Sequence, residues 1–303
     1  MSTDPVKSER PSADNTAAVI VSYNPDAGFT NRVKRLAQHV AKVLIVDNHS
    51  GHPSTETLRR LSFESRVNLV LNDSNLGVAT ALNQGVRWAK QLGYRWLLTF
   101  DQDTIASDHC VGTAAQVYDQ FPHKDAIAVI GAQPFGAANG RRQEASESDW
   151  IETRTVITSG TLMSLEAFDV IGPFRDEFFI DLVDLEYCLR ARQKGFKVLL
   201  SLSPSMHHQI GATTTHALPW KDTGTSNHSP LRRYYMMRNH TVLALEYLLK
   251  DPVWVATSMY SRIKSTILMC LFEPDRLAKL RFTGLGLWDG LILKFNRDLS
   301  ART

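Results

Sequence analysis

The sequence predicts an α/β fold with a mostly parallel β-sheet flanked by helices, and three observations support this. Apolar runs of strand length alternate with amphipathic helical patterns from about residue 17 to residue 202. Polar turns close several of these runs, and beyond about residue 230 the pattern is helical alone. Alternating strands and helices build βαβ units, in which neighbouring strands run parallel. We therefore expect a disordered tail at 1–16, an α/β domain at 17–230 and a helical C-terminal region at 231–303.

The expected elements follow one another in a regular order. The strands are short apolar runs bounded by turn residues, and they are expected at 17–22, 42–46, 67–71, 96–100, 127–131, 155–163 and 197–201. Helices are expected after the first strand through Arg35 and at 54–64, 76–91, 107–120 and 181–194. The polar segment 136–150 is expected to be a loop beside the site or at the surface.

Composition and length are those of a packed globular protein. The chain has 303 residues, of which 43% are apolar and 21% charged, as is usual for folded domains. It contains no uncharged apolar run of about 18 residues, and residues 1–16 lack the apolar core of a signal peptide. Cys110, Cys188 and Cys270 are far apart in sequence, so we expect reduced thiols. These features predict a cytoplasmic protein.

The positive charge is concentrated at the C-terminal end. Residues 231–303 carry 12 basic and 6 acidic side chains, whereas the rest of the chain carries 22 basic and 25 acidic ones. Basic helices rich in Trp and Leu fit peripheral contact with the inner face of the cell membrane. A packed helical subdomain or the interface of a homo-oligomer explains the same composition equally well. A nucleic-acid partner is not expected.

Three polar turns follow three of the predicted strands directly. They contain Tyr23-Asn24, Asp47-Asn48 and Asp101-Gln102-Asp103. In open α/β sheets, ligands bind in the crevice at the carboxyl ends of the strands. We therefore expect the three turns to converge on one binding site.

Asp101 and Asp103 are candidate metal ligands. Mg²⁺ and Mn²⁺ prefer oxygen ligands and leave positions for water and phosphate, so a pair of carboxylates holds such an ion against a diphosphate. The same tripeptide in an ordinary loop is a solvated turn. Its position after the apolar strand 96–100 favours the functional interpretation.

Further downstream, two more clusters carry groups suited to catalysis. Asp181, Asp184 and Glu186 lie at the start of a predicted helix, where acids also stabilise the helix dipole. Helix capping explains one or two of these acids, and for Asp184 we favour a role in catalysis. His207 and His208 follow the last predicted strand, and one of them is expected to bind the metal ion.

Two other segments combine features of binding and of ordinary folding. Arg232 and Arg233 are suited to bind phosphate, whereas a basic start of an amphipathic helix explains them equally well. Gly77 would allow a ligand to approach the backbone closely, and Asp73 or Ser74 is expected to be the N-cap of the following helix.

Taken together, these motifs resemble glycosyltransferase family 2, and within it the bacterial rhamnosyltransferases of O-antigen and other surface polysaccharides. The matching pieces cover roughly residues 17–240 and are, in order, VIVSYNPD, VLIVDNHSG, DSNLGVATALNQG, LLTFDQDT, TSGTLMS, FFIDLVDLEYCLRARQKGFKV, HHQIG and RRYYMMRN. The resemblance implies a GT-A fold, Mg²⁺ or Mn²⁺ as cofactor, and dTDP-L-rhamnose as donor. It implies a glycan or lipid-linked acceptor.

The resemblance also assigns the residues that bind the nucleotide sugar. It places the nucleoside at Tyr23, Asn24 and Asp47, with Asn75 and Gly77 lining the same pocket.

The remaining assignments concern the reacting groups. The resemblance places Asp101 near the ribose or sugar, Asp103 on the metal ion and Asp184 as the base. His208 matches the family's His for metal or phosphate, because Gly211 follows it at the family's spacing.

This chain departs from the family pattern at two places. Many relatives have Glu-Asp where this chain has Val183-Asp184, so Asp181 is expected to compensate for the missing acid. Met236-Met237 stands where aromatic residues are more usual, which leaves the role of that helix open.

An inverting, metal-dependent transfer follows from these assignments, with Asp184 taking the proton of the acceptor hydroxyl. Two alternatives remain open: a family 2 transferase that uses a UDP-hexose or a galactofuranose donor, and a catalytically silent protein that binds sugar nucleotides. A nucleotidyltransferase is disfavoured because 22–26 lacks a Gly-rich basic loop, and a dehydrogenase because no G-x-G-x-x-G follows the first strand.

Overall fold

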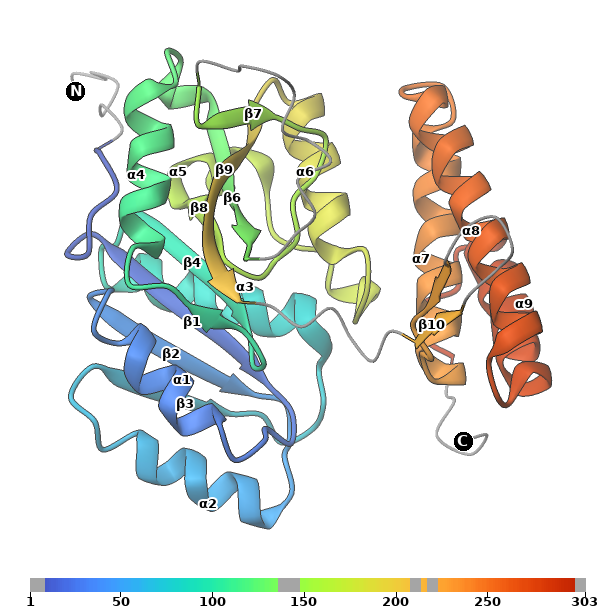
Figure 1. Ribbon diagram of the computed structural model, residues 1–303, viewed down its shortest axis with the longest axis horizontal. Coiled ribbons are helices and arrows are strands. Elements are labelled where there is room, and N and C mark those ends of the chain that lie inside the picture. Colours follow the sequence, from blue (N-terminus) through green and yellow to red (C-terminus); the bar gives the residue numbers. More distant parts are fainter. Residues whose placement is uncertain (1–8, 136–147, 208–213, 217–222, 298–303) are drawn as a thin grey trace. The chain divides into compact units, whose positions relative to one another are not determined.

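Figure 1 shows the computed structural model of the chain, which describes residues 9–135, 148–207, 214–216 and 223–297. The chain divides into two compact units. The first, called the sheet unit here, comprises Met1–Asp176 and Asp184–Gln209. The second, called the helical unit, comprises Glu177–Val183 and Ile210–Thr303. The helical unit thus includes a seven-residue segment from the middle of the chain.

The first half of the central sheet is wholly parallel. Its strands, in spatial order, are β3 (Val67–Leu71), β2 (Lys42–Asp47), β1 (Thr16–Ser22) and β4 (Trp96–Asp101). The central strands β1, β2 and β4 are buried almost throughout. Helices cover both faces of such strands, which explains why they are continuous apolar runs rather than alternating ones.

The second half of the sheet adds antiparallel pairs. β8 (Thr161–Ser164) pairs with β4 and β6 (Ile127–Pro134), and β6 runs parallel to β9 (Lys197–His207). Two short strands, β5 (Ile105–Ala106) and β7 (Trp150–Glu152), pair with β9 in the antiparallel sense. The predicted α/β fold with its large, mostly parallel sheet is confirmed.

One expected strand, 155–163, is shorter than predicted and begins only at Thr161. The preceding residues cross the end of β4 instead, and the carbonyl of Thr158 accepts a hydrogen bond from the Thr99 hydroxyl at 2.5 Å. Gly160 has a φ of +73°, which takes the backbone out of the extended region. This turn brings Thr158 and Ser159 to the edge of the sheet where the predicted site lies.

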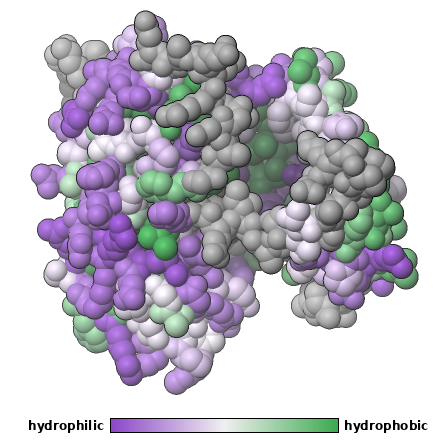
Figure 2. All heavy atoms as spheres, viewed as in Figure 1, coloured by the Kyte–Doolittle hydropathy of each residue, from purple (hydrophilic) through white to green (hydrophobic). Residues whose placement is uncertain are grey.

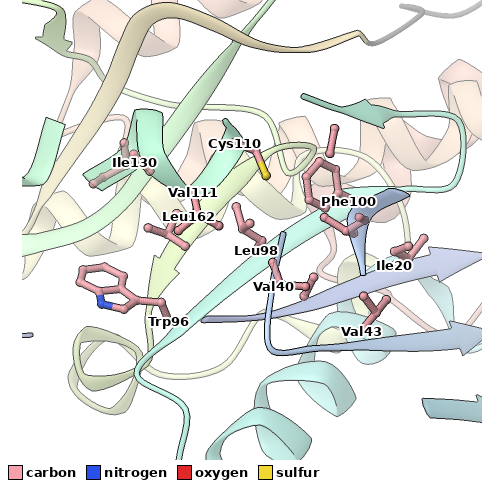
Figure 3. Close-up of a cluster of buried hydrophobic side chains, with 14 of the residues drawn as sticks. Ile20, Val40, Val43, Trp96, Leu98, Phe100, Cys110, Val111, Ile130 and Leu162 are labelled. Atoms are coloured by element: carbon pink, nitrogen blue, oxygen red, sulfur yellow. The ribbon is translucent and has the colours of Figure 1, made fainter. Parts of the chain in front are cut away.

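Helices cover both faces of the sheet. They are α1 (Phe29–Leu36), α2 (His52–Leu61), α3 (Gly77–Gln91), α4 (Cys110–Gln120), α5 (Leu165–Ile171) and α6 (Val183–Gln193), with single 3₁₀ turns at Lys124–Ala126 and Asp176–Phe178. Figure 3 shows how Cys110 and Val111 of α4 pack on Leu98, Phe100 and Ile20 of the sheet. α3 packs on the opposite face, where Gly85 lies against the side chain of Val19.

The helical unit contains three long helices and a small hairpin among its described residues. The helices are α7 (Pro230–Tyr247), α8 (Pro252–Phe272) and α9 (Arg276–Leu291), and the hairpin pairs β10 (Thr214–His216) with β11 (Thr223–Thr225). The predicted helical C-terminal region is therefore present. Within the described ranges no helix has both the length and the apolar character needed to cross a membrane.

Buried ion pairs tie the three helices together. Glu273 at the end of α8 lies 2.8 Å from a nitrogen of Arg233 and 2.9 Å from the Lys279 ammonium. Burial alone would raise the pKa of Glu273, but the hydrogen bond from Lys279 and the charge of Arg233 outweigh it and lower the pKa. A second buried carboxylate, Asp289 of α9, accepts a hydrogen bond from the Tyr234 hydroxyl and pairs with Arg297.

Helices α7 and α9 pack closely because α9 has glycine at the contact. A Cβ atom built on Gly286 would lie 2.3 Å from the carbonyl oxygen of Tyr234. We expect Gly286→Ala to lower the free energy of unfolding by about 1–3 kcal/mol, because the two backbones must move apart. Chemical denaturation measures this change.

Gly284→Ala is the matched control on the same helix. A Cβ there meets nothing within 4 Å, so alanine is expected to stabilise the helix by about 0.5–1 kcal/mol. Equal stabilities of the two variants would show that α7 and α9 are not in close backbone contact.

Candidate active site

The turns that follow β1 and β2 form one hydrogen-bonded group. The Asp47 carboxylate is buried and accepts hydrogen bonds from the Ser22 hydroxyl at 2.8 Å and from the Ser50 amide at 2.8 Å. The Ser50 hydroxyl in turn accepts a bond from the Asn24 amide at 2.7 Å, and the Asn24 side chain accepts one from the Gly51 amide at 2.8 Å. The structure thus brings Asn24 and Asp47 together, as the sequence predicts.

A second group lies at the start of α3. The Asn48 side-chain amide donates to the carbonyl of Gly77 at 3.1 Å, and the Asn72 amide donates to the Asn48 side-chain oxygen at 3.0 Å. Asn75 accepts a bond from the Gly77 amide at 3.0 Å, and Gly77 has a φ of +83°, which favours glycine. Asn48 belongs to one of the three turns expected at the site, whereas Asn72, which directly follows β3, was not predicted.

The helix start itself differs from the prediction. Neither Asp73 nor Ser74 caps α3, because the N-cap residue is Leu76 and makes no side-chain cap. Asn75 instead binds the first amide of the helix. The positive end of α3 therefore lies beside the predicted nucleotide pocket, where it favours a negatively charged group.

Asp101-Gln102-Asp103 continues from the end of β4 into a turn. The half-buried Asp101 donates its backbone amide to the Ser159 hydroxyl at 3.1 Å. Gln102 accepts a hydrogen bond from the Tyr23 amide at 2.7 Å, so the first and third predicted turns are in direct contact. Tyr23 itself is half exposed, and Asp103 is exposed.

Arg32 of α1 contacts the turn at 101–103 and holds its backbone in place. It donates to the backbone carbonyl of Gln102 at 2.7 Å and pairs with Asp26 at 2.8 Å. The hydrogen bond from Arg32 holds the pKa of Asp26 below its usual value. Arg32 was missed by the sequence analysis, because no motif marks it.

Asp184 lies at the start of α6, and its carboxylate is fixed by two backbone amides. Thr158 donates to Oδ2 at 2.9 Å and Leu185 donates to Oδ1 at 2.8 Å. Thr158 precedes Ser159, which binds the Asp101 amide and lies 2.6 Å from the Thr104 hydroxyl. One short segment therefore connects the predicted base to the predicted metal turn.

The neighbouring acids have different environments. Glu186 is buried and forms a two-pronged ion pair with Arg190 at 2.7 and 2.8 Å. Asp181 belongs to the helical unit and pairs with Arg232 through both of its oxygens. Of the three predicted acids, Asp184 is thus the one that the sheet unit places beside Asp101.

A small cavity adjoins Asp184. It is lined by Thr99, Thr158 and Asp184 together with Tyr187 and Cys188. Burial raises the pKa of the Cys188 thiol to about 12, so this thiol stays protonated at neutral pH. A protonated, buried thiol is a poor nucleophile.

The predicted histidine ligand cannot be placed. His207 is the last residue of β9, and its ring stacks on Phe135 with 4.4 Å between ring centres. His208, the predicted ligand, lies outside the described residues, as does Gly211. Within the described ranges no three His, Cys, Asp or Glu side chains form a ready metal cage. The assignment of His208 stays a prediction.

Arg232 and Arg233 lie on α7 of the helical unit. Arg232 is half exposed and holds Asp181 at 2.9 Å. Arg233 is buried and donates to Glu273 and to the Ser265 hydroxyl at 2.8 and 3.1 Å. Their binding of the nucleotide sugar stays a prediction.

The adjacent Arg238-Asn239 pair has a clear structural role. The Asn239 amide lies 2.8–3.0 Å from the carbonyl oxygens of Phe178, Ile180 and Asp181. Phe179, Asp181 and Leu182 all have positive φ values near 60°, a strained conformation that persists only where neighbours hold it.

The order of these strands and turns along the chain matches a known family. Residues 17–175, about half of the chain, match the sequence model of Glycosyl transferase family 2. The chain belongs to this family. The transferase is 27% identical over 289 residues to dTDP-rhamnosyl transferase RfbF of Shigella flexneri, covering 91% of this chain and 95% of that protein.

Solved structures confirm the fold of the transferase. S. aureus TarS 1-349 in complex with UDP-GlcNAc aligns with a TM-score of 0.58 at 15% identity, covering 93% of this chain and 82% of that one. Mannosyltransferase PcManGT from Pyrobaculum calidifontis, with GDP-Man and Mn2+, also gives 0.58, at 13% identity, covering 94% and 88%. At these identities the likeness supports the predicted GT-A fold.

Proposed function

We propose that the transferase moves L-rhamnose from dTDP-L-rhamnose, with inversion, to a hydroxyl of a glycan or lipid-linked acceptor in surface polysaccharide biosynthesis. One observation carries the mechanism: the segment Thr158-Ser159 binds both the Asp184 carboxylate and the Asp101 amide. A relative named for dTDP-rhamnosyl transfer, similar over nearly its whole length, supports the choice of donor.

The donor nucleotide binds along the carboxyl edge of β1, β2 and β4 in this proposal. Tyr23, Asn24 and Asp47 contact the nucleoside, and Asn75 and Gly77 form the wall at the start of α3. The hydrogen bonds among these turns support it, because a pocket held in place before binding loses little conformational freedom when the ligand arrives.

Asp103 is proposed as a ligand of a divalent ion, and Asp101 lies nearer the sugar nucleotide in this proposal. Asp101 is half-buried at the end of β4 and Asp103 is exposed in the next turn, and a carboxylate supplies the oxygen ligands that Mg²⁺ and Mn²⁺ prefer. When bound, such an ion stabilises the negative charge that develops on the leaving diphosphate. His208 is proposed as a further ligand, and Arg232 as a cation for the donor phosphates.

Asp184 acts as the general base in this proposal. Its carboxylate takes the proton of the acceptor hydroxyl while the hydroxyl oxygen attacks the anomeric carbon and the bond to the diphosphate breaks. A single displacement of this kind inverts the configuration at the anomeric carbon. The two backbone amides on Asp184 support the assignment, since they fix the direction of the carboxylate.

Two features of the helical unit support the proposal that the protein contacts the inner face of the membrane peripherally. Exposed apolar side chains recur along α8 at Val253, Tyr260, Ile263, Ile267 and Leu271, a spacing that places them along one side of the helix. α9 has a similar row, at Leu277, Leu280, Leu287, Trp288 and Leu291, and Figure 2 shows hydrophobic surface over these helices. Exposed basic residues (Lys264, Arg276 and Arg281) accompany them, as is typical of helices at anionic membrane surfaces.

A donor panel tests the proposal. The purified chain is incubated with Mn²⁺ or Mg²⁺ and one of dTDP-rhamnose, a UDP-hexose, UDP-galactofuranose or GDP-mannose, and the release of nucleoside diphosphate is measured. We expect release from dTDP-rhamnose and its loss when the metal is chelated.

Other donors are included in the panel because two structural relatives were solved with UDP-GlcNAc and with GDP-Man. Release from a UDP-sugar alone would replace the rhamnosyl assignment and keep the reaction. Tight donor binding without release from any donor, with acceptor present, would identify a silent binding protein.

A further inference from the structure

Helices α7, α8 and α9 enclose a small pocket within the helical unit, and one of its lining residues, Arg233, is also a predicted ligand of the donor. It is lined by Arg233, Met236 and Met237 of α7, Arg262, Ser265 and Thr266 of α8, and Thr283 of α9. The lining thus contains two guanidinium groups, three hydroxyls and the two methionines that depart from the family pattern. Methionine side chains are flexible and adapt to different ligand shapes.

The two arginines of this pocket are not equally neutralised. Arg233 pairs with Glu273, yet its Nε is buried and has no hydrogen-bond partner among the described residues. The guanidinium group of Arg262 forms neither a hydrogen bond nor an ion pair with any residue in the described ranges. A guanidinium carries five N–H donors, and leaving them unsatisfied away from bulk water is costly.

The carboxylates near Arg262 do not neutralise its positive charge, because each of them is already paired with another residue. Glu273 is held by Arg233 and Lys279, and Asp181 is held by Arg232. Once these pairs are counted, Arg262 remains as a cation with no counterion in direct contact among the residues that the structure describes. Burial lowers the pKa of Arg262, the Asp181 charge opposes this, and the Arg233 charge adds to it.

Two histidines of the helical unit have lowered pKa values, chiefly because they are buried and in part because of nearby arginine charges. Burial and the charge of Arg262 lower the pKa of His240 to about 4. Burial, followed by the charge of Arg232, lowers the pKa of His228 to about 4, although Asp181 opposes the shift. Both rings are therefore neutral at pH 7, and the arginines carry the positive charge of this region.

The geometry points to a phosphate-binding pocket, formed by Arg262, the Nε of Arg233 and the Ser265 hydroxyl, that takes a phosphate group carried on an apolar chain. Ser265 accepts its hydrogen bond from Arg233, which leaves the hydroxyl hydrogen available for an anion. Paired guanidinium groups match the oxygens of phosphate and diphosphate.

The apolar part of such a ligand has a surface to bind. Ile263 follows Arg262 directly and is 57% exposed, and Ile267 one turn further on is 54% exposed. α8 therefore presents a cationic side and an apolar side next to each other. An amphiphilic phosphate ester matches both, whereas a free nucleotide matches only the first.

The test compares two charge-removing variants on the same helix. Arg262→Gln removes the cation of the pocket, and Lys264→Gln removes the same charge from an exposed position two residues away. Farnesyl diphosphate is titrated into each full-length protein by calorimetry. We expect its dissociation constant to rise at least about tenfold in Arg262→Gln, as loss of a charge-assisted hydrogen bond implies, and to stay unchanged in Lys264→Gln.

Three further arms make the outcome decisive. Arg262→Lys keeps the charge with fewer hydrogen-bond donors, so it should bind farnesyl diphosphate with intermediate affinity. Thermal unfolding confirms that each variant is folded. Inorganic diphosphate should bind wild type more weakly than farnesyl diphosphate, and still depend on Arg262. Vesicles of phosphatidylcholine with phosphatidylglycerol reveal whether a bilayer headgroup is the source of the phosphate, in which case sedimentation with them depends on Arg262.

Either of two results would overturn the pocket: no dependence of any of these probes on Arg262, or an equal loss of farnesyl diphosphate and inorganic diphosphate binding in Lys264→Gln. Release of nucleoside diphosphate in the absence of acceptor is measured in parallel and should be the same in wild type and Arg262→Gln. The proposed function therefore fails if wild type releases none and binds no donor. The proposed pocket is contradicted only by the comparison of probe binding among wild type, Arg262→Gln and Lys264→Gln.

Discussion

Asp184→Asn is expected to lower sugar transfer by roughly two to four orders of magnitude while donor affinity is kept, because a general base contributes about this much. The carboxylate accepts backbone hydrogen bonds on both oxygens. Asparagine can accept only one of them, so the variant loses basicity without losing its volume. Transfer is measured with acceptor present, and donor affinity is measured separately by calorimetry.

Asp125→Asn is the control for this substitution, since Asp125 is an exposed carboxylate of the sheet unit remote in sequence from the site. It should transfer at the wild-type rate. Thermal unfolding of both variants tells a loss of catalysis from a loss of folded protein. Near-wild-type transfer by a folded Asp184→Asn protein would remove Asp184 from the role of base.

The second large effect is expected at Asp103. Asp103→Asn should lower metal-dependent release of nucleoside diphosphate by roughly two to three orders of magnitude, since stabilisation of the leaving group by a metal is worth several kcal/mol. Asp103 is exposed in a turn, so the substitution should leave the fold unchanged. Release is measured against increasing Mn²⁺, and higher metal concentrations should restore part of the activity.

Asp108→Asn provides the comparison, because Asp108 lies five residues further on, is exposed, and pairs with Arg35 on the surface. Its Mn²⁺ titration should match that of wild type. If Asp103→Asn also gave the wild-type titration, Asp103 would not be a metal ligand, and Asp101 would become the candidate to test next.

The sheet and one part of the site could be predicted because both depend on local pattern. Buried parallel strands are uninterrupted apolar runs, and their carboxyl ends meet at one edge of the sheet. The positions of Asn24, Asp47 and Asp101 follow from these two facts. The direct contact between Tyr23 and Gln102 agrees with that reasoning.

The other part of the site depends on contacts between residues far apart in sequence. Ser159 lies 58 positions from Asp101, and a Ser-Gly pair is common in loops, so no local signal announces its hydrogen bond. Arg232 and Arg233 illustrate the same limit. Neighbours in sequence, they have opposite environments, because only the packing of α7 against other parts of the helical unit decides which one is buried.

The route of the chain through the helical unit has a consequence for the newly synthesised protein. Asn239 holds the carbonyls of Phe178, Ile180 and Asp181, and the peptide chain passes from there directly into Asp184. At synthesis rates of about 5–20 residues per second, Asn239 is made several seconds after that segment. The sheet can therefore form on the ribosome before the strained lead-in to Asp184 is fixed. Every strand of the large sheet precedes Asn239 in the chain, so the lead-in to Asp184 is held in place only after all of these strands have been synthesised.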